Sequence, residues 1–237
     1  MPNPWMLPLL LATGYGLWVA LRRPADGAAP AGPTPALHLP LFLLTLALIS
    51  TALMLSGLVA ELDQQLLLSL RASLTPLLVS GFGLFTHSGS AFFLTPLIAL
   101  MSGWLVCQGR RADALLLCLS GLGGALLVVL LKAVFARPRP ALWDTLELAS
   151  FSFPSGHTMG TAACASALAV VLCRLYPAQR QTWWGLALGW VALVGLWRLT
   201  LGVHWPSAGF TGATLGVALT LLLSRLPGCR QRPCGPG

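Results

Sequence analysis

The sequence predicts an all-α protein, a polytopic bundle of helices that span a membrane. Of its 237 residues, 56% are hydrophobic and only 8% are charged, whereas a soluble domain carries about a quarter charged residues. The apolar residues also fall in runs of roughly 17 to 24 residues, each long enough to cross a hydrocarbon core about 30 Å thick. The chain therefore has too little polar surface to be a soluble globule.

Seven apolar runs qualify as spans, at residues 5–21, 39–60, 88–106, 113–135, 157–175, 183–201 and 208–224. The first has no positive segment before it and is followed by Arg22 and Arg23 instead of a small-residue cleavage site, which favours a span over a signal peptide. We therefore expect an N-terminal span and linker (1–38), a membrane domain of six helices (39–225) and a cytoplasmic tail (226–237).

A shorter amphipathic segment lies between the second and third spans. Its leucines share one helical face, opposite Gln, Ser and Arg residues. Two interpretations stay open: a helix that lies in the membrane interface, or an ordinary helix packed on the bundle. The leucines are Leu66, Leu67, Leu70, Leu74, Leu77 and Leu78.

The distribution of basic residues predicts the orientation in the membrane. With the N-terminus outside, nine Lys and Arg residues fall in inner segments and five in outer segments or span ends, as the positive-inside rule requires. The composition suggests a multi-pass protein of a bacterial inner membrane. The net charge of +8 then reflects contact with anionic lipid headgroups; nucleic-acid binding would need a basic patch on a soluble domain.

Basic and histidine side chains gather at the predicted outer face. The chain has no acidic residue after Glu147, so this group of cations calls for an anionic ligand. Taken singly, each residue would be an interfacial anchor or a solvated turn residue; together, on one face, they predict a site for phosphate, which Arg and Lys bind well. The residues are Lys132, Arg137, Arg139, His157, Arg198 and His204.

The segment Pro154-Ser155-Gly156-His157 reads as the start of a helix. Ser155 is a favoured N-cap type, and Gly156 permits close approach of a ligand to the backbone. The free N–H groups of this helix end would face phosphate oxygens. Two histidines suffice for covalent phosphoryl transfer, one attacking phosphorus and the other protonating the leaving oxygen. With cations to neutralise the oxygens, no metal or other cofactor is needed.

These residues resemble the three motifs of the type 2 phosphatidic acid phosphatase family, which is related to the vanadium haloperoxidases. The motif K-x6-R-P matches Lys132-AVFARP-Arg139-Pro140, and P-S-G-H is intact at 154–157. The motif S-R-x5-H-x3-D matches Trp197-Arg198-LTLGV-His204-WPS-Ala208. The resemblance implies a six-helix phosphatase core within 39–225, with the span at 5–21 as an addition.

The resemblance also implies roles for individual residues. His204 would be the nucleophile that forms a phosphohistidine, and His157 the general acid. The phosphate would be bound by Lys132, Arg139, Ser155, Gly156 and Arg198. Family substrates include undecaprenyl diphosphate, phosphatidylglycerol phosphate, phosphatidic acid and lipid A phosphates, so the expected partners are a membrane lipid and the bilayer.

Two positions depart from the motif. Trp197 replaces the usual Ser, and Ala208 replaces the Asp that in the family orients the nucleophilic His. In a serine triad, loss of the analogous Asp costs about 10⁴-fold in rate. Asp144 or Glu147 is the expected surrogate carboxylate, with Ser207 or a backbone carbonyl as weaker candidates.

Three function classes follow. The leading hypothesis is metal-independent hydrolysis of a lipid phosphate or diphosphate; a phosphotransferase would look the same. The second is a non-catalytic protein that binds lipid headgroups, which Ala208 favours and the intact His157 and His204 oppose. The third, an anion channel or transporter, predicts charges at mid-span depth, and the spans have almost none.

Overall fold

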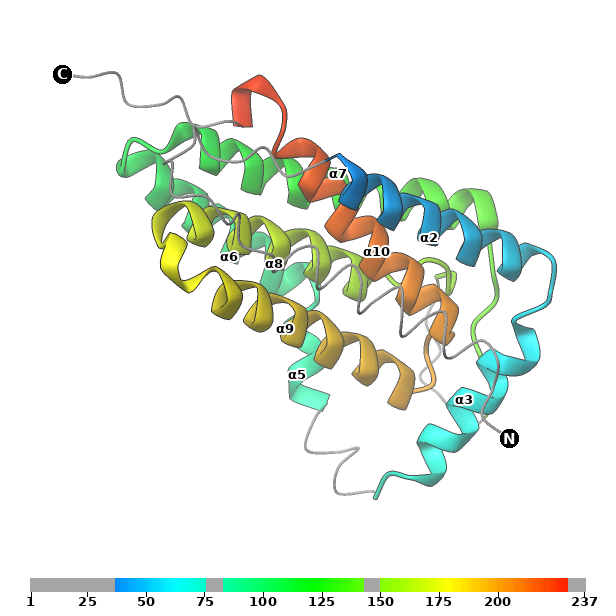
Figure 1. Cartoon of the computed structure of the whole chain (residues 1–237). Coiled ribbons are helices and arrows are strands. Elements are labelled where there is room, and N and C mark those ends of the chain that lie inside the picture. The colour runs from blue at the N-terminus through cyan, green and yellow to red at the C-terminus, as the bar shows by residue number, and fades with distance from the viewer. Residues whose placement is uncertain (1–36, 76–82, 143–149, 230–237) are drawn as a thin grey trace.

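The computed structural model describes residues 37–75, 83–142 and 150–229, and every regular element within these ranges is a helix. Six long helices lie alongside one another (Figure 1), so the predicted helical bundle is confirmed. They are α2 (His38–Leu55), α6 (Ala91–Cys107), α7 (Arg111–Phe135), α8 (Gly156–Leu175), α9 (Arg180–Thr200) and α10 (Pro206–Leu223). The shorter elements are α3 (Ala60–Ala72), α5 (Gly83–His87) and the 3-10 turns Pro177–Gln179 and Pro227–Cys229.

The six long helices correspond to the last six predicted spans. Helices α2, α7, α8 and α10 are both long and apolar enough to cross a membrane, and α6 is a shorter apolar helix. Helix α2 ends at Leu55, before the predicted boundary at residue 60, and the turn that follows contains Gly57 with φ of +76°, a conformation that favours glycine. The predicted span at 5–21 lies outside the described residues.

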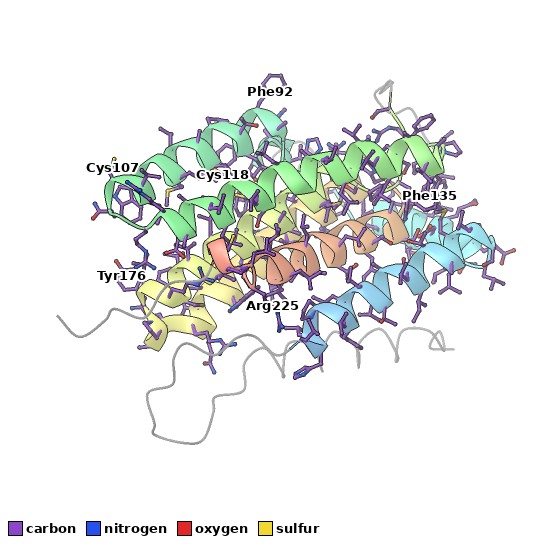
Figure 2. All side chains as sticks on the ribbon, turned by 90° about the horizontal axis from the view of Figure 1, so that it is seen from above. Phe92, Cys107, Cys118, Phe135, Tyr176 and Arg225 are labelled. Atoms are coloured by element: carbon purple, nitrogen blue, oxygen red, sulfur yellow. The ribbon has the colours of Figure 1, made fainter. Side chains whose placement is uncertain are left out.

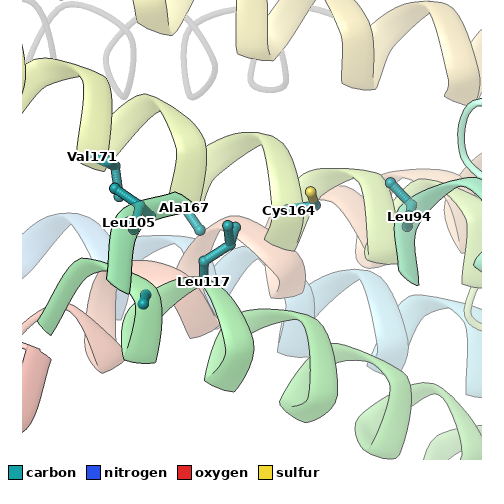
Figure 3. Packing of buried hydrophobic residues seen from close by; sticks show 7 residues of the cluster. Leu94, Leu105, Leu117, Cys164, Ala167 and Val171 are labelled. Atoms are coloured by element: carbon teal, nitrogen blue, oxygen red, sulfur yellow. The ribbon is translucent and has the colours of Figure 1, made fainter. Parts of the chain in front are cut away.

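Helix α8 forms the centre of the bundle and packs against α7, α9 and α10. Its buried face is built largely from small residues, among them five alanines, and small residues let helix backbones approach closely in membranes. Along its contact with α6 and α7, Cys164, Ala167 and Val171 pack against Leu105 and Leu117 (Figure 3). The centre of the bundle is therefore tightly packed.

The outer surface of the bundle is apolar. Leu48 on α2, Leu100 on α6 and Leu122 on α7 are each about 70% exposed. Figure 2 shows Phe92, which is 95% exposed, projecting from the bundle. In water such a surface would be unstable, whereas in a bilayer it faces hydrocarbon at no cost.

A buried ion-pair cluster fixes one end of the bundle. Asp113, in the first turn of α7, is fully buried and pairs with Arg110 at 2.6 Å and with Arg174 of α8 at 2.6 Å. Arg174 also donates to the carbonyl oxygen of Cys229, 3.0 Å away. The contacts tie the segment after α10 to α7 and α8.

At the other end, α3 packs against α9 and α10. Of the two interpretations of this amphipathic segment, the structure shows the helix packed on the bundle. Asp63 and Leu67 are its buried residues, whereas Leu66 and Leu68 are exposed. Leu77 and Leu78 of the predicted apolar face lie outside the described residues.

Candidate active site

Three loops meet at the end of the bundle where α7 and α9 finish and α8 and α10 begin (Figure 1). They are the segment after α7 (136–142), the segment before α8 (150–155) and the turn between α9 and α10 (201–205). Because these helices run antiparallel in pairs, all three predicted motifs reach the same end. Hydrogen bonds between the loops then fix the positions of the predicted site residues.

His204 lies in the third loop and is 1% exposed. Its Nδ1 is 2.6 Å from the carbonyl oxygen of Ser152. A carbonyl oxygen only accepts, so Nδ1 carries the proton and donates this hydrogen bond. In neutral imidazole the lone pair then lies on Nε2, which is 3.4 Å from Nη1 of Arg139. The ring is thus held with Nε2 toward the cationic residues, where it accepts a hydrogen bond from Arg139.

The surroundings of His204 also favour its neutral form. Burial, followed by the positive charges of Arg198 and Arg139, holds the pKa of His204 well below its usual range. The hydrogen bond to Ser152 acts in the opposite direction and only partly offsets these causes. A neutral ring with its lone pair on Nε2 is the form in which histidine acts as a nucleophile.

Besides its contact with His204, Arg139 makes three hydrogen bonds to oxygen atoms. Its Nε donates to the carbonyl oxygen of Ser150 at 2.7 Å, its Nη2 to the Ser150 hydroxyl at 2.8 Å, and its Nη1 to the carbonyl oxygen of Val203 at 2.5 Å. Lys132, in the last turn of α7, donates to the same Ser150 hydroxyl at 3.2 Å. All of these acceptors are neutral, so none of these hydrogen bonds balances the positive charge of Arg139 or Lys132.

Arg198 adds a third cation from the last turn of α9. It is 7% exposed, and its Nε is buried without a hydrogen-bond partner among the described residues. Within the part of the chain that the structure describes, neither Arg198 nor Lys132 or Arg139 forms an ion pair with a carboxylate. The charges of all three act on His157, in the first turn of α8.

Ser155 occupies the N-cap position of α8, and Gly156 is the first residue of the helix, in agreement with the predicted helix start. The Ser155 backbone N–H donates to the carbonyl oxygen of Ala208 at 3.1 Å. Its hydroxyl is fully buried and lies 2.9 Å from the Thr158 hydroxyl, so it makes no side-chain cap. These contacts join the second motif to the start of α10.

Ala208 stands where the resemblance implies an aspartate that orients the histidine. Ala208 is fully buried, and His204 Nδ1 bonds to the Ser152 backbone instead. The expected surrogates, Asp144 and Glu147, lie outside the described residues. A backbone carbonyl, one of the weaker candidates, is the partner of His204 Nδ1, whereas Ser207 bonds elsewhere.

Sequence reasoning missed Asp63. This residue of α3 is 2% exposed and accepts hydrogen bonds from the backbone N–H and the hydroxyl of Ser207, at 2.8 and 2.5 Å. It also pairs with Arg137 at 2.8 Å. Asp63 could have been found from the small number of acidic residues. The chain has only 6 Asp and Glu residues, so each is a candidate partner for a cation. The expected surrogates, however, all lie after the first motif in the chain.

A membrane helix bundle that gathers two histidines and three cations at one end, none of them paired with a described carboxylate, has the features of an integral membrane enzyme that acts on phosphate esters. Residues 113–232 match the PAP2 superfamily, and the chain belongs to this family. The predicted resemblance to the type 2 phosphatidic acid phosphatases is thereby confirmed.

Relatives extend this assignment. The chain is 33% identical to phosphatidylglycerophosphatase B of Bacillus subtilis over 141 residues, which cover 58% of this chain and 70% of the relative. It is 29% identical to decaprenylphosphoryl-5-phosphoribose phosphatase of Mycobacterium tuberculosis over 140 residues, covering 57% of this chain and 73% of the other. The crystal structure of a transmembrane PAP2-type phosphatidylglycerolphosphate phosphatase from Bacillus subtilis superimposes with a TM-score of 0.72 at 29% identity, over 78% of this chain and 94% of that one.

These similarities establish the class of the protein. It is a multi-pass membrane protein of a family of lipid phosphatases, and the predicted phosphatase activity agrees with the relatives.

Proposed function

We propose that this protein hydrolyses the phosphate monoester of a membrane lipid at the outer face of the bacterial inner membrane, with phosphatidylglycerol phosphate as the first candidate substrate. The substrate choice is supported by the names of the Bacillus subtilis relative and structural neighbour. Undecaprenyl diphosphate, phosphatidic acid and lipid A phosphate are the competing substrates. The orientation is supported by the excess of Lys and Arg in the predicted inner segments.

One observation carries the proposal: three cations around two histidines, none of them neutralised by a described carboxylate. Burying an unbalanced charge costs free energy, and the cost falls when a bound anion compensates it. The buried Nε of Arg198, which has no partner among the described residues, is a donor available to such an anion. Phosphate meets this requirement because its oxygens accept several charge-assisted hydrogen bonds at once.

The proposed reaction proceeds in two steps. Nε2 of His204 attacks phosphorus, the bond to the lipid oxygen breaks, and His157 gives its proton to that departing oxygen. Water then attacks the phosphohistidine and loses a proton to His157, and the P–N bond breaks to release inorganic phosphate and neutral His204. Lys132, Arg139 and Arg198 stabilise the charge on the phosphoryl oxygens in both steps.

Ser155 and Gly156 have a supporting part in this proposal. They begin α8, whose first N–H groups have no partner within the helix and carry the positive end of its dipole. A phosphoryl group beside His157 would lie near these donors. The direct interaction of cations with the oxygens lets the reaction proceed without a metal ion.

The proposal is tested by measuring phosphate release from the purified protein in detergent with EDTA present, on phosphatidylglycerol phosphate and the three competing lipids in parallel. We expect release from phosphatidylglycerol phosphate in wild type and none in His204→Ala. Acid quenching with labelled substrate should trap a phosphohistidine in wild type only. His38→Ala is the matched control, because His38 is exposed at the start of α2 and should retain full activity.

Each other outcome has a defined meaning. Release from a different lipid only would replace the substrate assignment and keep the mechanism. Activity that survives in His204→Ala would refute His204 as nucleophile. Silence toward all four lipids, together with binding of their headgroups, would favour the non-catalytic alternative that Ala208 first suggested.

A further inference from the structure

A carboxylate from outside the segment that matches the family bonds to residues next to His204 and Ser152. Asp63 lies on α3, before the segment 113–232 that matches the family, and it is 144 residues from its partner Ser207. A carboxylate this deeply buried needs several donors to offset the loss of hydration. Asp63 has three, contributed by Ser207 and Arg137.

The first contact fixes the start of α10. Pro206 is the first residue of this helix and Ser207 the second, so the Ser207 N–H has no partner within the helix. Asp63 Oδ1 accepts from it at 2.8 Å. Asp63 thus caps α10 from another helix, with a negative charge at the positive end of the helix dipole. The cap lies three residues after His204 and holds the end of its loop.

The second contact reaches the group that orients the imidazole. The Arg137 guanidinium bonds to Asp63 and to the Ser207 hydroxyl, each at 2.8 Å. The Arg137 carbonyl oxygen accepts from the Ser152 N–H at 2.8 Å, and the Ser152 carbonyl oxygen accepts from His204 Nδ1 at 2.6 Å. An unbroken series of contacts therefore leads from Asp63 through Arg137 and Ser152 to the ring of His204.

Arg137 also secures the residue next to the nucleophile. Its guanidinium lies over the ring of Trp205, with 5.1 Å from Cζ to the ring centroid, a distance at which cation–π attraction is effective. The Trp205 indole N–H donates to the carbonyl oxygen of Pro138 at 3.0 Å. Through Trp205, the loop after α7 is thus joined to the loop of His204.

We propose that Asp63 is a positioning residue for His204 and takes over, through Arg137 and the Ser152 carbonyl, the orienting role of the aspartate that Ala208 replaces. Asp63 does not touch the imidazole or the substrate; it acts by fixing the two loops between which the ring is held. The inference rests on the proposed function, because it assigns the support of the proposed nucleophile.

The test is steady-state kinetics of Asp63→Asn, which keeps the size of the side chain and removes its charge. Displacement of a reacting group by about 1 Å costs on the order of 10²-fold in rate, so we expect kcat to fall by roughly this factor while KM changes little. The matched control is Glu61→Gln, since Glu61 is an exposed acid of the same helix, and it should keep the wild-type kcat.

A rescue experiment separates positioning from a purely structural role. Ala208→Asp restores a carboxylate at the family position, so it should raise the lowered kcat of Asp63→Asn. In the wild-type background it should bring little gain, because His204 Nδ1 already has a partner. A double variant as slow as Asp63→Asn alone would overturn the proposal, and so would a large gain in the wild-type background.

Protein stability and the proposed function are controlled separately. Activities are expressed per folded molecule, and a kcat for Asp63→Asn equal to that of wild type on this basis would overturn the inference. If Asp63→Asn does not fold, Ser207→Ala is measured instead. This variant removes the bridging hydroxyl and keeps the hydrogen bond from the backbone N–H to Asp63, so it should lower kcat and leave KM unchanged. An unchanged kcat would overturn the inference. A wild-type protein without phosphatase activity, or one indifferent to His204→Ala, would instead refute the proposed function.

Discussion

His204 is held in its neutral form by a backbone carbonyl and by nearby cations. In a serine triad a carboxylate orients the histidine and stabilises its protonated form. Here a carbonyl oxygen, that of Ser152, fixes the tautomer, and the cations Arg139 and Arg198 oppose protonation. Such surroundings suit a nucleophile, which must offer a lone pair, more than they suit a general base, which must gain a proton.

The lowered pKa of His204 predicts a dependence of stability on pH. The unfolded chain takes up a proton on His204 near pH 6.5, whereas the folded protein does so only at lower pH. The stabilisation is therefore complete above about pH 6.5 and is lost as the pH falls toward the pKa of the folded state. At about pH 5.5 the loss amounts to roughly 1.4 kcal/mol.

Thermal unfolding in detergent between pH 8 and pH 5 measures this loss, in a buffer free of phosphate because a bound anion would favour the charged ring. On acidification the Tm of the wild type should fall further than the Tm of His204→Asn, in which the titrating group is absent. Parallel curves for the two proteins would show that His204 titrates with an ordinary pKa.

At the scale of elements, the contact between α8 and α10 sets the geometry of the site. Ser155 at the start of α8 and Ala208 at the start of α10 are joined by a backbone hydrogen bond, so the two helices must lie close together. Gly216 of α10 permits this approach: a Cβ there would lie 2.6 Å from the Met159 carbonyl oxygen and 2.9 Å from the Ala163 nitrogen. Both neighbours are backbone atoms and cannot move aside.

Gly216→Ala should therefore destabilise the protein despite the better helix propensity of alanine. Overpacking of this kind costs about 1–3 kcal/mol, and separation of α8 from α10 should also lower kcat. Tm and kcat are measured beside those of Gly189→Ala, whose added methyl meets nothing within 4 Å and which should match or slightly exceed wild-type stability. Equal Tm values for the two variants would contradict the close approach of α8 to α10.

At the scale of the whole molecule, the two ends of the bundle differ in their charge balance. One end contains Asp113, paired with Arg110 and Arg174. The other contains the cations of the site, which pair with no carboxylate among the described residues. Figure 2 shows Cys107 and Tyr176 at the first end and Phe135 at the second. The excess of Lys and Arg in the inner segments that the sequence predicts supports our proposal that the Asp113 end faces the cytoplasm and the site faces outward.

Cysteine labelling tests this orientation. Cys107 is exposed at the end of α6, so a membrane-impermeant maleimide should react with it in inverted membrane vesicles and not in intact spheroplasts. Cys107→Ser identifies the signal that belongs to this thiol. Labelling of Cys107 in intact spheroplasts would reverse the orientation and place the site on the cytoplasmic face.

Much of the helical architecture was readable from the sequence because hydrophobic run length is a local property. Each of the last six apolar runs became a long helix of the bundle, since every backbone polar group within hydrocarbon must be satisfied inside its own helix. The helix start at Ser155 and Gly156 was equally local. Boundaries set by turns were less predictable, as the early end of α2 shows.

The sequence by itself determined the class of protein, the number of long helices in the described part and the residues of the three motifs. Each of these depends on the length of apolar runs, on residue type or on spacing, which are local properties of the chain. Only the tertiary structure decided what supports His204. The Ser152 carbonyl lies 52 residues from His204, and Asp63 lies 144 residues from Ser207 beside it. Such contacts arise from the packing of α3 and α8 against α10, and no local pattern records which distant groups that packing brings together.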